Sequence, residues 1–484
     1  MSAQTIFTWA ERKPEATALV YNGESLSYGQ FANCLAAAIN FLRSYSLPAG
    51  STAVVVIGNL RSAWLAVLAL RAVGLHTITV QNIEEAQKLG VTNVSTVVFG
   101  EGTAQPRTGQ AFASATWITF PTKTILANSE TSLNVDGAFA PEPGGHFIYT
   151  SGTTGTHKRI FTAGGDGPLA LGALPLANRM TERTIFHGLF FPLFTGAGAS
   201  LPGYAWRAGG TVVLDQRPGA LGTLLQQQFN MIFLVPAMIE TMAASNAGPV
   251  NGFADLHIAL GGGFAPYSAL EKIRRFVTSD IEIHYASSEC GTVARSKFGG
   301  DPEDVVWLTP EPDRFIKIEN ETGEPCGLDE EGELTVELTE TDRRAYVDDP
   351  ETSARIFRNG FFYPGDMAMR RADGKIRILG RTQDVVNVAG FKVATAPLEQ
   401  QIGQYLGART VCILDSQNAA GETEIVVAVE ADREPTPEQV ARVKEHFKMA
   451  RTRIAVMSQF PRGEAMQKVD RRALRNVVWP NPAT

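Results

Sequence analysis

The stretch IYTSGTTGTHKR, residues 148 to 159, joins two glycines and five serine or threonine residues to a closing His-Lys-Arg cluster. Glycine allows backbone N–H groups to approach an anion, hydroxyls add donors, and a lysine supplies a point charge. A Walker A loop is excluded, because His157 stands where that motif has its second glycine. Composition alone therefore fits a phosphate-binding loop and a flexible surface loop equally well.

The overall composition indicates a globular chain of more than one domain. Its 484 residues exceed one ordinary core, and 44% are hydrophobic and 19% charged. The net charge of −7 argues against nucleic acid as a partner. The four cysteines are widely scattered with no CxxC pair, which argues against a disulfide framework or a zinc site.

Two further features bear on the compartment. The sequence begins without the basic and apolar pattern of a signal peptide, and its most apolar helical stretch, Ala63 to Leu75, is interrupted by Arg71. This stretch is too short to cross a bilayer. We expect a cytoplasmic protein with no membrane span.

Helix-like and strand-like segments alternate along much of the chain. Phe31 to Leu42 has a helical pattern, and Thr52 to Ile57 is an apolar, β-branched run typical of a buried strand. This alternation predicts α/β layers with mostly parallel strands. From about Val306, short alternating strands separated by glycine turns predict an antiparallel or barrel-like subdomain. A smaller unit follows Arg381, in which the acidic run from Glu430 to Glu434 is interpreted as a solvated edge.

Several segments, in the expected order, complete a known set of motifs. Ser151 to Lys158 resembles the phosphate loop of the adenylate-forming superfamily, which contains acyl- and aryl-CoA ligases, luciferases and nonribosomal adenylation domains. The other segments similar to motifs of this family are Phe7 to Tyr28, Ala259 to Pro266, His284 to Glu289, Gly360 to Asp366, Gly380 to Val393 and Phe460 to Arg471. The resemblance covers essentially the whole chain.

The resemblance implies an α/β fold in two domains. Residues 1–381 would form a large N-terminal domain of several subdomains, with mostly parallel sheets layered with helices and a small β-barrel-like part. Residues 382–484 would form a small, mobile α+β domain that acts as a lid. Gln383 occupies the position of the hinge, where Asp or Lys is more usual.

The reaction implied is the attack of a carboxylate on the α-phosphorus of ATP, which gives an acyl-adenylate and pyrophosphate. Both reactants are anions, so the site has to neutralise charge and align them. By resemblance, Lys158 and the loop would hold the β- and γ-phosphates. The loop residues concerned are Thr150, Ser151, Gly152, Thr153, Thr154 and Gly155.

The resemblance implies that the adenine base of ATP and the metal ion bind near residue 285. Tyr285 would stack on adenine beside the turn of Gly262 and Gly263. Glu289 would hold Mg²⁺, since a hard cation prefers carboxylate oxygen, and Ser288 would contact the α-phosphate or the metal shell. The structural alternative for Tyr285 is a core tyrosine, and that for Glu289 is an ordinary surface glutamate.

Further residues complete the implied site. Asp366 would accept hydrogen bonds from the ribose hydroxyls, and Arg381 would approach ribose or phosphate. Lys468 is the candidate adenylation lysine, and Gly390 is the small residue beside the path of CoA. Taken alone, Asp366 would cap a turn, and the cations would be solvated.

Four positions depart from the family pattern. His157 and Arg159 replace Pro and Gly, which predicts a more positive loop, and Gln467 replaces the Gly before the lysine. Thr195 stands where many acyl-CoA ligases carry His.

The segment from Ile185 to Ala199 bears on the substrate. It is rich in Phe and uncharged apart from His187, without the Asp that would pair with an α-ammonium. We therefore expect a small-molecule carboxylic acid without an α-amino group, aryl or alkyl. No carrier-protein motif follows Lys468, which favours transfer to a separate thiol, CoA first. The alternatives are a standalone enzyme that loads a carrier protein, and a catalytically weakened homologue that binds nucleotide or acyl groups.

Overall fold

The structure is a computed structural model, and it describes most of the 484 residues. The described residues are 2–103, 112–132, 134–135, 139–140, 142–150, 158–165, 175–244, 255–264, 267–340, 342–343, 345–382, 385–388, 391–417, 423–447, 451–462 and 469–479. The chain forms two compact units. Unit 1 comprises Met1–Thr292, Lys297–Gly299 and Leu338–Phe357, and unit 2 comprises Val293–Ser296, Gly300–Glu337 and Arg358–Thr484.

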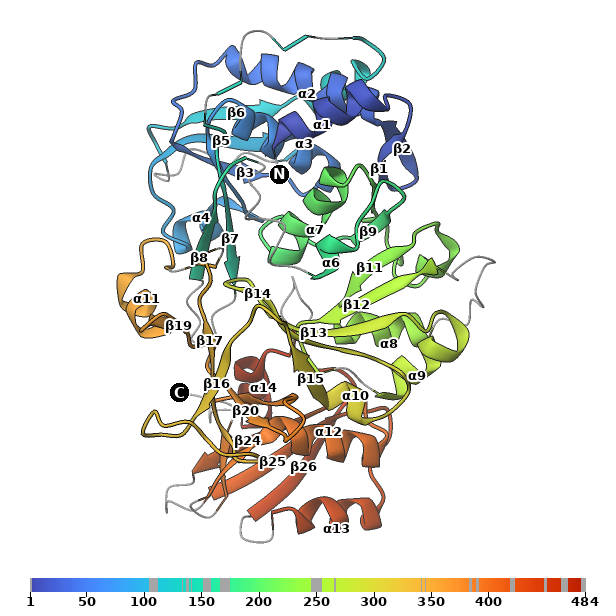
Figure 1. The fold of residues 1–484 in the computed structure, drawn as a ribbon, viewed down its shortest axis with the longest axis vertical. Coiled ribbons are helices and arrows are strands. Elements are labelled where there is room, and N and C mark those ends of the chain that lie inside the picture. The colour runs from blue at the N-terminus through green and yellow to red at the C-terminus, as the bar shows by residue number, and fades with distance from the viewer. Residues whose placement is uncertain are drawn as a thin grey trace. The chain divides into compact units, whose positions relative to one another are not determined.

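A six-stranded sheet in unit 1 contains both flanks of the Ser/Thr-rich stretch. Its strands are β3 (Thr52–Val56), β4 (His76–Thr79), β5 (Val94–Gly100), β6 (Thr116–Phe120), β7 (His146–Thr150) and β8 (Lys158–Thr162). They lie in the order β6-β5-β3-β4-β7-β8, and all pairings are parallel except the β7–β8 hairpin (Figure 1). Every residue of β3 is buried, as expected of a strand covered on both faces.

A second sheet of unit 1 positions the segments near residues 262 and 285. Its strands are β1 (Thr17–Tyr21), β2 (Glu24–Ser27), β9 (Ile185–Leu189), β10 (Thr211–Leu214), β11 (Met231–Leu234), β12 (His257–Gly261) and β13 (Ile281–Ser287). They lie in the order β13-β12-β11-β9-β10-β1-β2, all parallel apart from the β1–β2 hairpin. The carboxyl ends of such strands share one edge, where ligands bind in open α/β sheets.

Helices cover these sheets. They are α1 (Ala3–Arg12), α2 (Tyr28–Arg43), α3 (Leu60–Ala72), α4 (Ile83–Lys88), α5 (Thr122–Ala127), α6 (Pro175–Asn178), α7 (Gly196–Arg207), α8 (Pro236–Ala244), α9 (Tyr267–Phe276) and α11 (Pro350–Ile356). Helix α2 begins with a capping box between Ser27 and Gln30. Every residue of α3 except Arg61 is buried, so this helix lies inside the main core together with α1 and α2.

Unit 2 begins with short antiparallel strands, as the change of pattern near Val306 predicts. They are β15 (Trp307–Pro310), β16 (Ile316–Glu319), β17 (Gly332–Glu337), β19 (Phe361–Phe362), β20 (Asp366–Arg370) and β21 (Ile376–Arg381), with α10 (Glu303–Val306) before β15. Two more elements, β14 (Gly291–Lys297) and β18 (Phe357–Arg358), have residues in both units. The described pairings among β15, β16, β17, β19, β20 and β21 are antiparallel.

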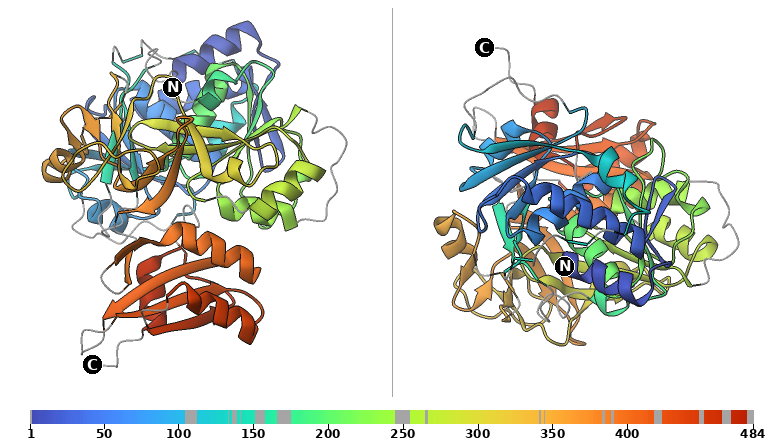
Figure 2. Two further views of the ribbon diagram at one scale, coloured as in Figure 1. Left: turned by 60° about the horizontal axis from the view of Figure 1, so that its bottom comes forward. Right: turned by 90° about the horizontal axis from the view of Figure 1, so that it is seen from above.

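The C-terminal part of unit 2 is a small α+β layer structure, seen in the left panel of Figure 2. It comprises the hairpin β22 (Val385–Val388) and β23 (Phe391–Ala394), the sheet β24 (Thr410–Gln417), β25 (Thr423–Glu430) and β26 (Arg451–Met457), and the helices α12 (Thr395–Leu406), α13 (Pro437–Glu445) and α14 (Arg471–Val478). Ile402 and Val443 of α12 and α13 pack on one face of the sheet, and Leu474 of α14 packs on the other.

The predicted α/β class and the parallel and antiparallel regions are confirmed. One local prediction needs correction, because Glu430 is not on a solvated edge. It is 4% exposed, because Arg462 Nη2 lies 2.5 Å from its carboxylate and neutralises the buried charge. The domain boundary between residues 381 and 382 stays a prediction. Among the described residues, no helix has the length and apolarity needed to cross a membrane.

Two buried histidines should make the fold sensitive to acid. Burial lowers the pKa of His146 and of His187 to about 4. The unfolded chain takes up these protons near its ordinary pKa of about 6.5, so stability is lost as the pH falls from there towards 4. We expect the free energy of unfolding to fall by about 2 kcal/mol per histidine between pH 7 and pH 5, measured by urea denaturation.

The variant His146→Gln should remove one share of this pH dependence. The exposed His446 provides the matched control, and His446→Gln should leave the slope unchanged. An unaltered slope in His146→Gln would contradict the assignment.

Candidate active site

The two ends of the Ser/Thr-rich stretch belong to the antiparallel strands β7 and β8. Strand β7 ends at Thr150 and β8 begins at Lys158, and these two residues pair across the ladder. The predicted loop residues between them, Ser151, Gly152, Thr153, Thr154 and Gly155 together with His157, lie outside the described residues. The structure thus places Thr150 and Lys158 opposite each other at the two ends of residues 151–157, and the phosphate-binding role of this segment stays a prediction.

Strand β7 is held firmly on the side of the Phe-rich segment. The Tyr149 N–H donates to the Phe194 carbonyl at 3.0 Å, and the two rings stack at 4.7 Å between centroids. Nε2–H of His146 donates to the Leu193 carbonyl at 2.9 Å, and Thr77 donates to Nδ1 at 2.8 Å. These contacts fix the neutral histidine in one tautomer and hold the entrance of the loop in place.

Ser288 and Glu289 occupy the tight turn between β13 and β14. The turn closes where the Cys290 N–H donates to the Ser287 hydroxyl at 3.2 Å, and Gly291 follows with a φ of +71°. The Tyr346 hydroxyl donates to Glu289 Oε1 at 2.7 Å. The Arg343 N–H donates to the Glu289 carbonyl at 2.9 Å. The glutamate is therefore held through both its side chain and its backbone.

Tyr346 also contacts the β7–β8 hairpin. Lys158 Nζ lies 5.0 Å from the centroid of the Tyr346 ring, within range of a cation–π interaction. The ring is 4% exposed and packs on Ile148 of β7 and Ile160 of β8. Our reading of the sequence missed Tyr346. Asp349 and Pro350 just beyond it indicate the start of a helix. No local sequence pattern, however, predicts the contacts of Tyr346 with residues so distant in the chain.

Arg159 has a different role from the one expected of it. Its guanidinium is 7% exposed and lies 2.8 Å from Asp348 Oδ2, and its carbonyl accepts from the Val347 N–H at 2.9 Å. The expected extra positive charge of the loop is therefore neutralised by a carboxylate. Arg159 joins β8 to the segment that carries Tyr346.

The two segments that are expected to lie beside adenine are at the ends of adjacent strands. Gly262 and Gly263 follow β12, and Gly262 has a φ of +84°, which favours glycine. Strand β13 runs parallel to β12 with His284 beside Gly261, so Tyr285 lies next to this turn. The Tyr285 side chain is partly exposed, so it is not a fully buried core tyrosine, and its stacking on adenine stays a prediction.

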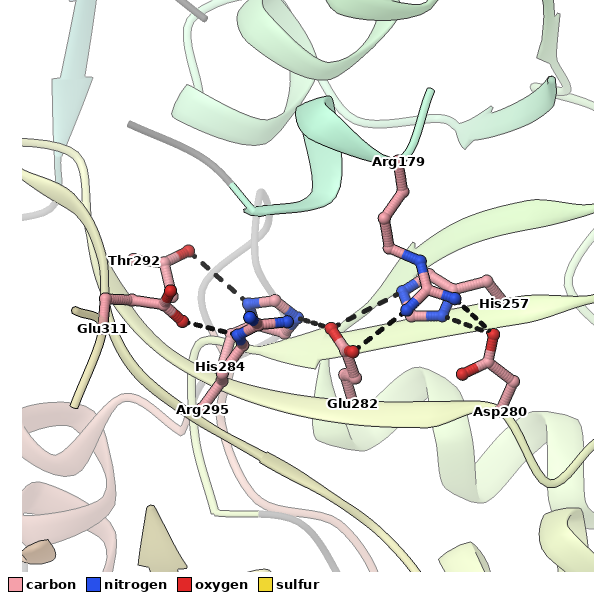
Figure 3. Close-up of polar contacts among 8 residues, drawn as sticks. All are labelled: Arg179, His257, Asp280, Glu282, His284, Thr292, Arg295 and Glu311. Atoms are coloured by element: carbon pink, nitrogen blue, oxygen red, sulfur yellow. Dashed lines mark hydrogen bonds and ion pairs between the residues drawn. The ribbon is translucent and has the colours of Figure 1, made fainter. Parts of the chain in front are cut away.

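A partly buried polar network supports these strand ends (Figure 3). Glu282 lies 3.0 Å from Arg179 and 3.5 Å from His284 Nε2. His257 Nδ1 lies 3.1 Å from Asp280, and burial lowers the pKa of His257. The network thus joins the segment after α6 to β12 and β13, and it fixes the strands from which the glycine turn and Tyr285 project.

Thr195 accounts for one departure from the family pattern. Its hydroxyl oxygen accepts from the Gly198 N–H at 3.0 Å and its O–H donates to the Pro192 carbonyl at 2.8 Å. Thr195 is therefore the N-cap of α7. The next residue, Gly196, lies close to the site, because a Cβ there would stand 3.1 Å from Ser288 Oγ.

Unit 2 brings Asp366 and Arg381 together. The two residues pair across β20 and β21, and Arg381 Nε lies 3.1 Å from Asp366 Oδ1. Arg381 also donates to the Pro364 carbonyl. Asp366 is 6% exposed and follows Gly365, whose φ is +74°. The carboxylate is therefore fixed at the start of β20, as recognition of a sugar edge requires.

Lys468 lies outside the described residues, as do Gln383, Gln467 and Gly390. The flanks of the Lys468 segment are described and anchored. Arg462 pairs with Val469 in an antiparallel bridge, and the Asp470 N–H donates to the Pro461 carbonyl at 2.8 Å. These contacts bring the two ends of residues 463–468 together.

Two ion pairs hold these flanks. The guanidinium of Arg471 lies 2.8 and 2.7 Å from the two oxygens of Glu399 in α12, and Arg462 pairs with Glu430. Burial raises the pKa of Glu399, and the charge of Arg471 opposes this rise. Both ends of the segment are thus tied to the core of the C-terminal part.

The chemistry of the donors around Glu289 suits magnesium bound with ATP. Mg²⁺ commonly takes one or two carboxylates and completes its shell with phosphate oxygens and water. No group of three or more His, Cys, Asp or Glu side chains able to hold a metal occurs among the described residues. One fixed carboxylate beside a phosphate hairpin therefore fits Mg²⁺ that arrives with ATP, whereas a permanent protein cage for a metal is not found there.

Comparison with known proteins decides the family. Residues 6–339 match the family described as AMP-binding enzyme. The chain belongs to this family. The AMP-binding family comprises the adenylate-forming enzymes, which activate carboxylic acids with ATP, so the resemblance seen in the sequence is confirmed.

Individual relatives are distant. Triostin synthetase I of Streptomyces triostinicus is 28% identical over 68% of this chain, and the chain spans 64% of that relative. The vibriobactin-specific 2,3-dihydroxybenzoate-AMP ligase of Vibrio cholerae is 23% identical over 96% of this chain and 92% of its own length.

The fold has close structural counterparts. The O-succinylbenzoate coenzyme A synthetase of Bacillus subtilis in complex with ATP and magnesium has a TM-score of 0.80. It is 20% identical, and the match covers 97% of this chain and 99% of that protein. This likeness shows that the AMP-binding chain has the adenylate-forming fold.

The Arg159–Asp348 pair yields a test. Asp348→Asn keeps the backbone with its φ of +56°, a conformation that Asn tolerates, but it leaves the buried guanidinium without its anion. We expect the free energy of unfolding to drop by about 1–3 kcal/mol, a range reduced because Asp348 is half exposed. Urea denaturation measures the loss.

A second substitution and a control complete this test. Replacing both residues, as Arg159→Met with Asp348→Asn, should recover most of the loss because no buried charge remains unpaired. Asp432→Asn is the matched control, since its pair with Arg409 is exposed on both sides and should change the stability much less than Asp348→Asn does. An equally small effect at Asp348 would show that the buried pair does not stabilise β8.

Proposed function

We propose that the protein uses ATP to convert a carboxylic acid without an α-amino group to its acyl-adenylate and pyrophosphate. It then transfers the acyl group to a thiol, CoA in the first instance. The observation that carries the proposal is the joining of Lys158 and Glu289 through Tyr346. A cation at the exit of a phosphate hairpin and a fixed carboxylate meet on one buried side chain, which suits a metal-bound polyphosphate.

Each residue has a role in the adenylation step. Lys158 and the hairpin loop neutralise the β- and γ-phosphates, so that the substrate carboxylate can approach the α-phosphorus. Ser288 donates its hydroxyl to the α-phosphate, and Tyr285 stacks on adenine beside Gly262 and Gly263. Mg²⁺, which Glu289 would hold, supplies charge neutralisation between the phosphates when it is bound.

Unit 2 supplies the remaining groups. Asp366 accepts hydrogen bonds from the ribose hydroxyls, and Arg381 orients that carboxylate. Lys468 balances the charge that develops between the attacking carboxylate and the α-phosphate. Residues 382–484 act as the mobile lid that delivers this lysine, with Gln383 at the hinge. Gly390 lines the path of the pantetheine thiol in the second half-reaction.

Charge in the Phe-rich segment supports the choice of acid. His187 is 1% exposed, burial lowers its pKa to about 4, and its ring is bonded to Gln227 at 3.1 Å. The segment is therefore neutral near pH 7. Asp215, which follows β10, is buried but lies 2.5 Å from Arg217. With its carboxylate already neutralised, it does not replace the missing partner of an α-ammonium group.

The second candidate is a standalone enzyme that loads a carrier protein. The name of the Vibrio cholerae relative, an AMP ligase, favours it, whereas the Bacillus subtilis structure bears the name of a coenzyme A synthetase. A catalytically weakened binding protein is the third candidate, motivated by the Gln383 and Gln467 departures.

The decisive test is ATP–pyrophosphate exchange with a panel of aryl, alkyl and amino acids. We expect exchange that depends on an acid without an α-amine, and no exchange with amino acids. Absence of exchange with every acid, in protein that binds ATP, would favour the weakened homologue. Mass detection of the thioester formed with CoA or with a holo carrier protein then identifies the acceptor.

Lys468→Ala separates the two half-reactions. We expect adenylate formation to fall by about 100-fold or more, because one charge aimed at the transition state is lost. Thioester formation from a supplied acyl-adenylate should change by less than about threefold, since that step does not use the lysine. Arg472→Ala, four residues further along and exposed, is the control. Equal loss of both steps would contradict the role of Lys468.

A further inference from the structure

The segment around Tyr346 makes contacts that the proposed function leaves unexplained. The family pattern assigns Lys158 to phosphate and Glu289 to the metal, and it assigns nothing to Tyr346. In the structure the hydroxyl of this residue donates to Glu289 Oε1 at 2.7 Å, and its ring lies 5.0 Å from Lys158 Nζ. One side chain thus contacts both groups of opposite charge.

We propose that Tyr346 is a positioning residue for the magnesium–ATP complex. Its hydroxyl fixes the orientation of the Glu289 carboxylate, and its ring face guides the Lys158 ammonium at the exit of the phosphate hairpin. The inference rests on the proposed function, because it takes Glu289 as the metal carboxylate and Lys158 as the phosphate cation.

The hydroxyl selects one carboxylate oxygen. Glu289 Oε1 accepts the Tyr346 hydrogen bond, so the carboxylate presents its other oxygen to a cation. A carboxylate that is already oriented loses less rotational freedom when a cation binds. Phenylalanine at residue 346 would retain the ring and lose this orientation.

The backbone around Tyr346 gives it the rigidity that this role needs. Its N–H donates to the Ser353 hydroxyl at 2.8 Å. The neighbouring N–H groups of Val347 and Arg343 donate to the carbonyls of Arg159 and Glu289, both at 2.9 Å. The segment is therefore tied to β8, to α11 and to the Glu289 turn.

Packing restricts the ring in the same way. Tyr346 is 4% exposed and lies among Ile148, Ile160 and Phe357, whose ring centroid is 5.2 Å away. A ring enclosed on these sides keeps one orientation towards both Lys158 and Glu289.

The first experiment measures ATP binding to Tyr346→Phe in the absence of an acid, by calorimetry, once with Mg²⁺ and once with EDTA. A hydrogen bond to a charged group corresponds to roughly a 10- to 100-fold change in affinity. We expect a weakening of this size with Mg²⁺ and a change of less than about threefold with EDTA. An equal loss in both conditions, or no loss in either, would overturn the proposal.

A double-mutant cycle tests whether Tyr346 acts through Glu289. In the Glu289→Gln background the metal-dependent effect should already be lost, so adding Tyr346→Phe should weaken Mg²⁺–ATP binding by less than about twofold. Additive losses would contradict action through the carboxylate. Tyr346→Leu removes the ring as well, and it should weaken ATP binding with EDTA too, because Lys158 loses its guide.

Tyr28→Phe is the matched control. Tyr28 is 0% exposed, and its hydroxyl donates to the Gly210 carbonyl at 2.7 Å, away from Lys158, Glu289 and Tyr346. It should lose a similar amount of stability without changing the magnesium dependence of ATP binding. Failure of the proposed function is distinguishable, since it appears as absent acid-dependent exchange in the wild-type protein. Wild-type exchange together with normal Mg²⁺–ATP binding by Tyr346→Phe would sink this inference alone.

Discussion

Tyr346 connects three stretches of chain that are far apart in sequence, through its hydrogen bond to Glu289 and its ring contact with Lys158. Glu289 lies in the turn between β13 and β14, Lys158 begins a strand of another sheet, and Tyr346 comes from the segment that precedes α11. The chemistry proposed for the site brings together two anions, a carboxylate and a polyphosphate. The groups that neutralise them have to be fixed before binding, because reorganising charged side chains during the reaction raises the barrier.

Buried ion pairs recur at the anchors of the functional segments. Arg159 with Asp348 holds the strand after the phosphate loop, while Arg471 with Glu399 holds one flank of the Lys468 segment. Removing such charges from water costs as much as their attraction returns, so the pairs add little net stability. Their geometry is nevertheless directional, particularly for the two-pronged Arg471 contact. Placing them beside these functional segments therefore fixes the position of the flanking residues at a small energetic cost.

The sequence predicted the fold class and much of the element order, because periodicity and turn residues are local signals. Thr52 to Ile57 became the buried strand β3, and Phe31 to Leu42 lies within α2. Candidate residues for adenine and for the metal could be named from the sequence because their motifs are contiguous, and their roles stay predictions. Tyr346 could not be found in this way, since its importance lies in contacts with Lys158 and Glu289, which no local pattern records.

The same limit explains the two misread charges. In the sequence, Arg159 is expected to make the loop more positive, and Glu430 is interpreted as part of a solvated edge. Both are buried against partners that lie at a distance along the chain, Asp348 and Arg462. A charge that departs from a family pattern can thus belong to the scaffold, leaving the ligand site unaltered. Thr195 supports the same view, because it caps α7 where relatives place a histidine. The departures at His157, Gln383 and Gln467 lie outside the described residues, so a functional meaning for them stays a prediction.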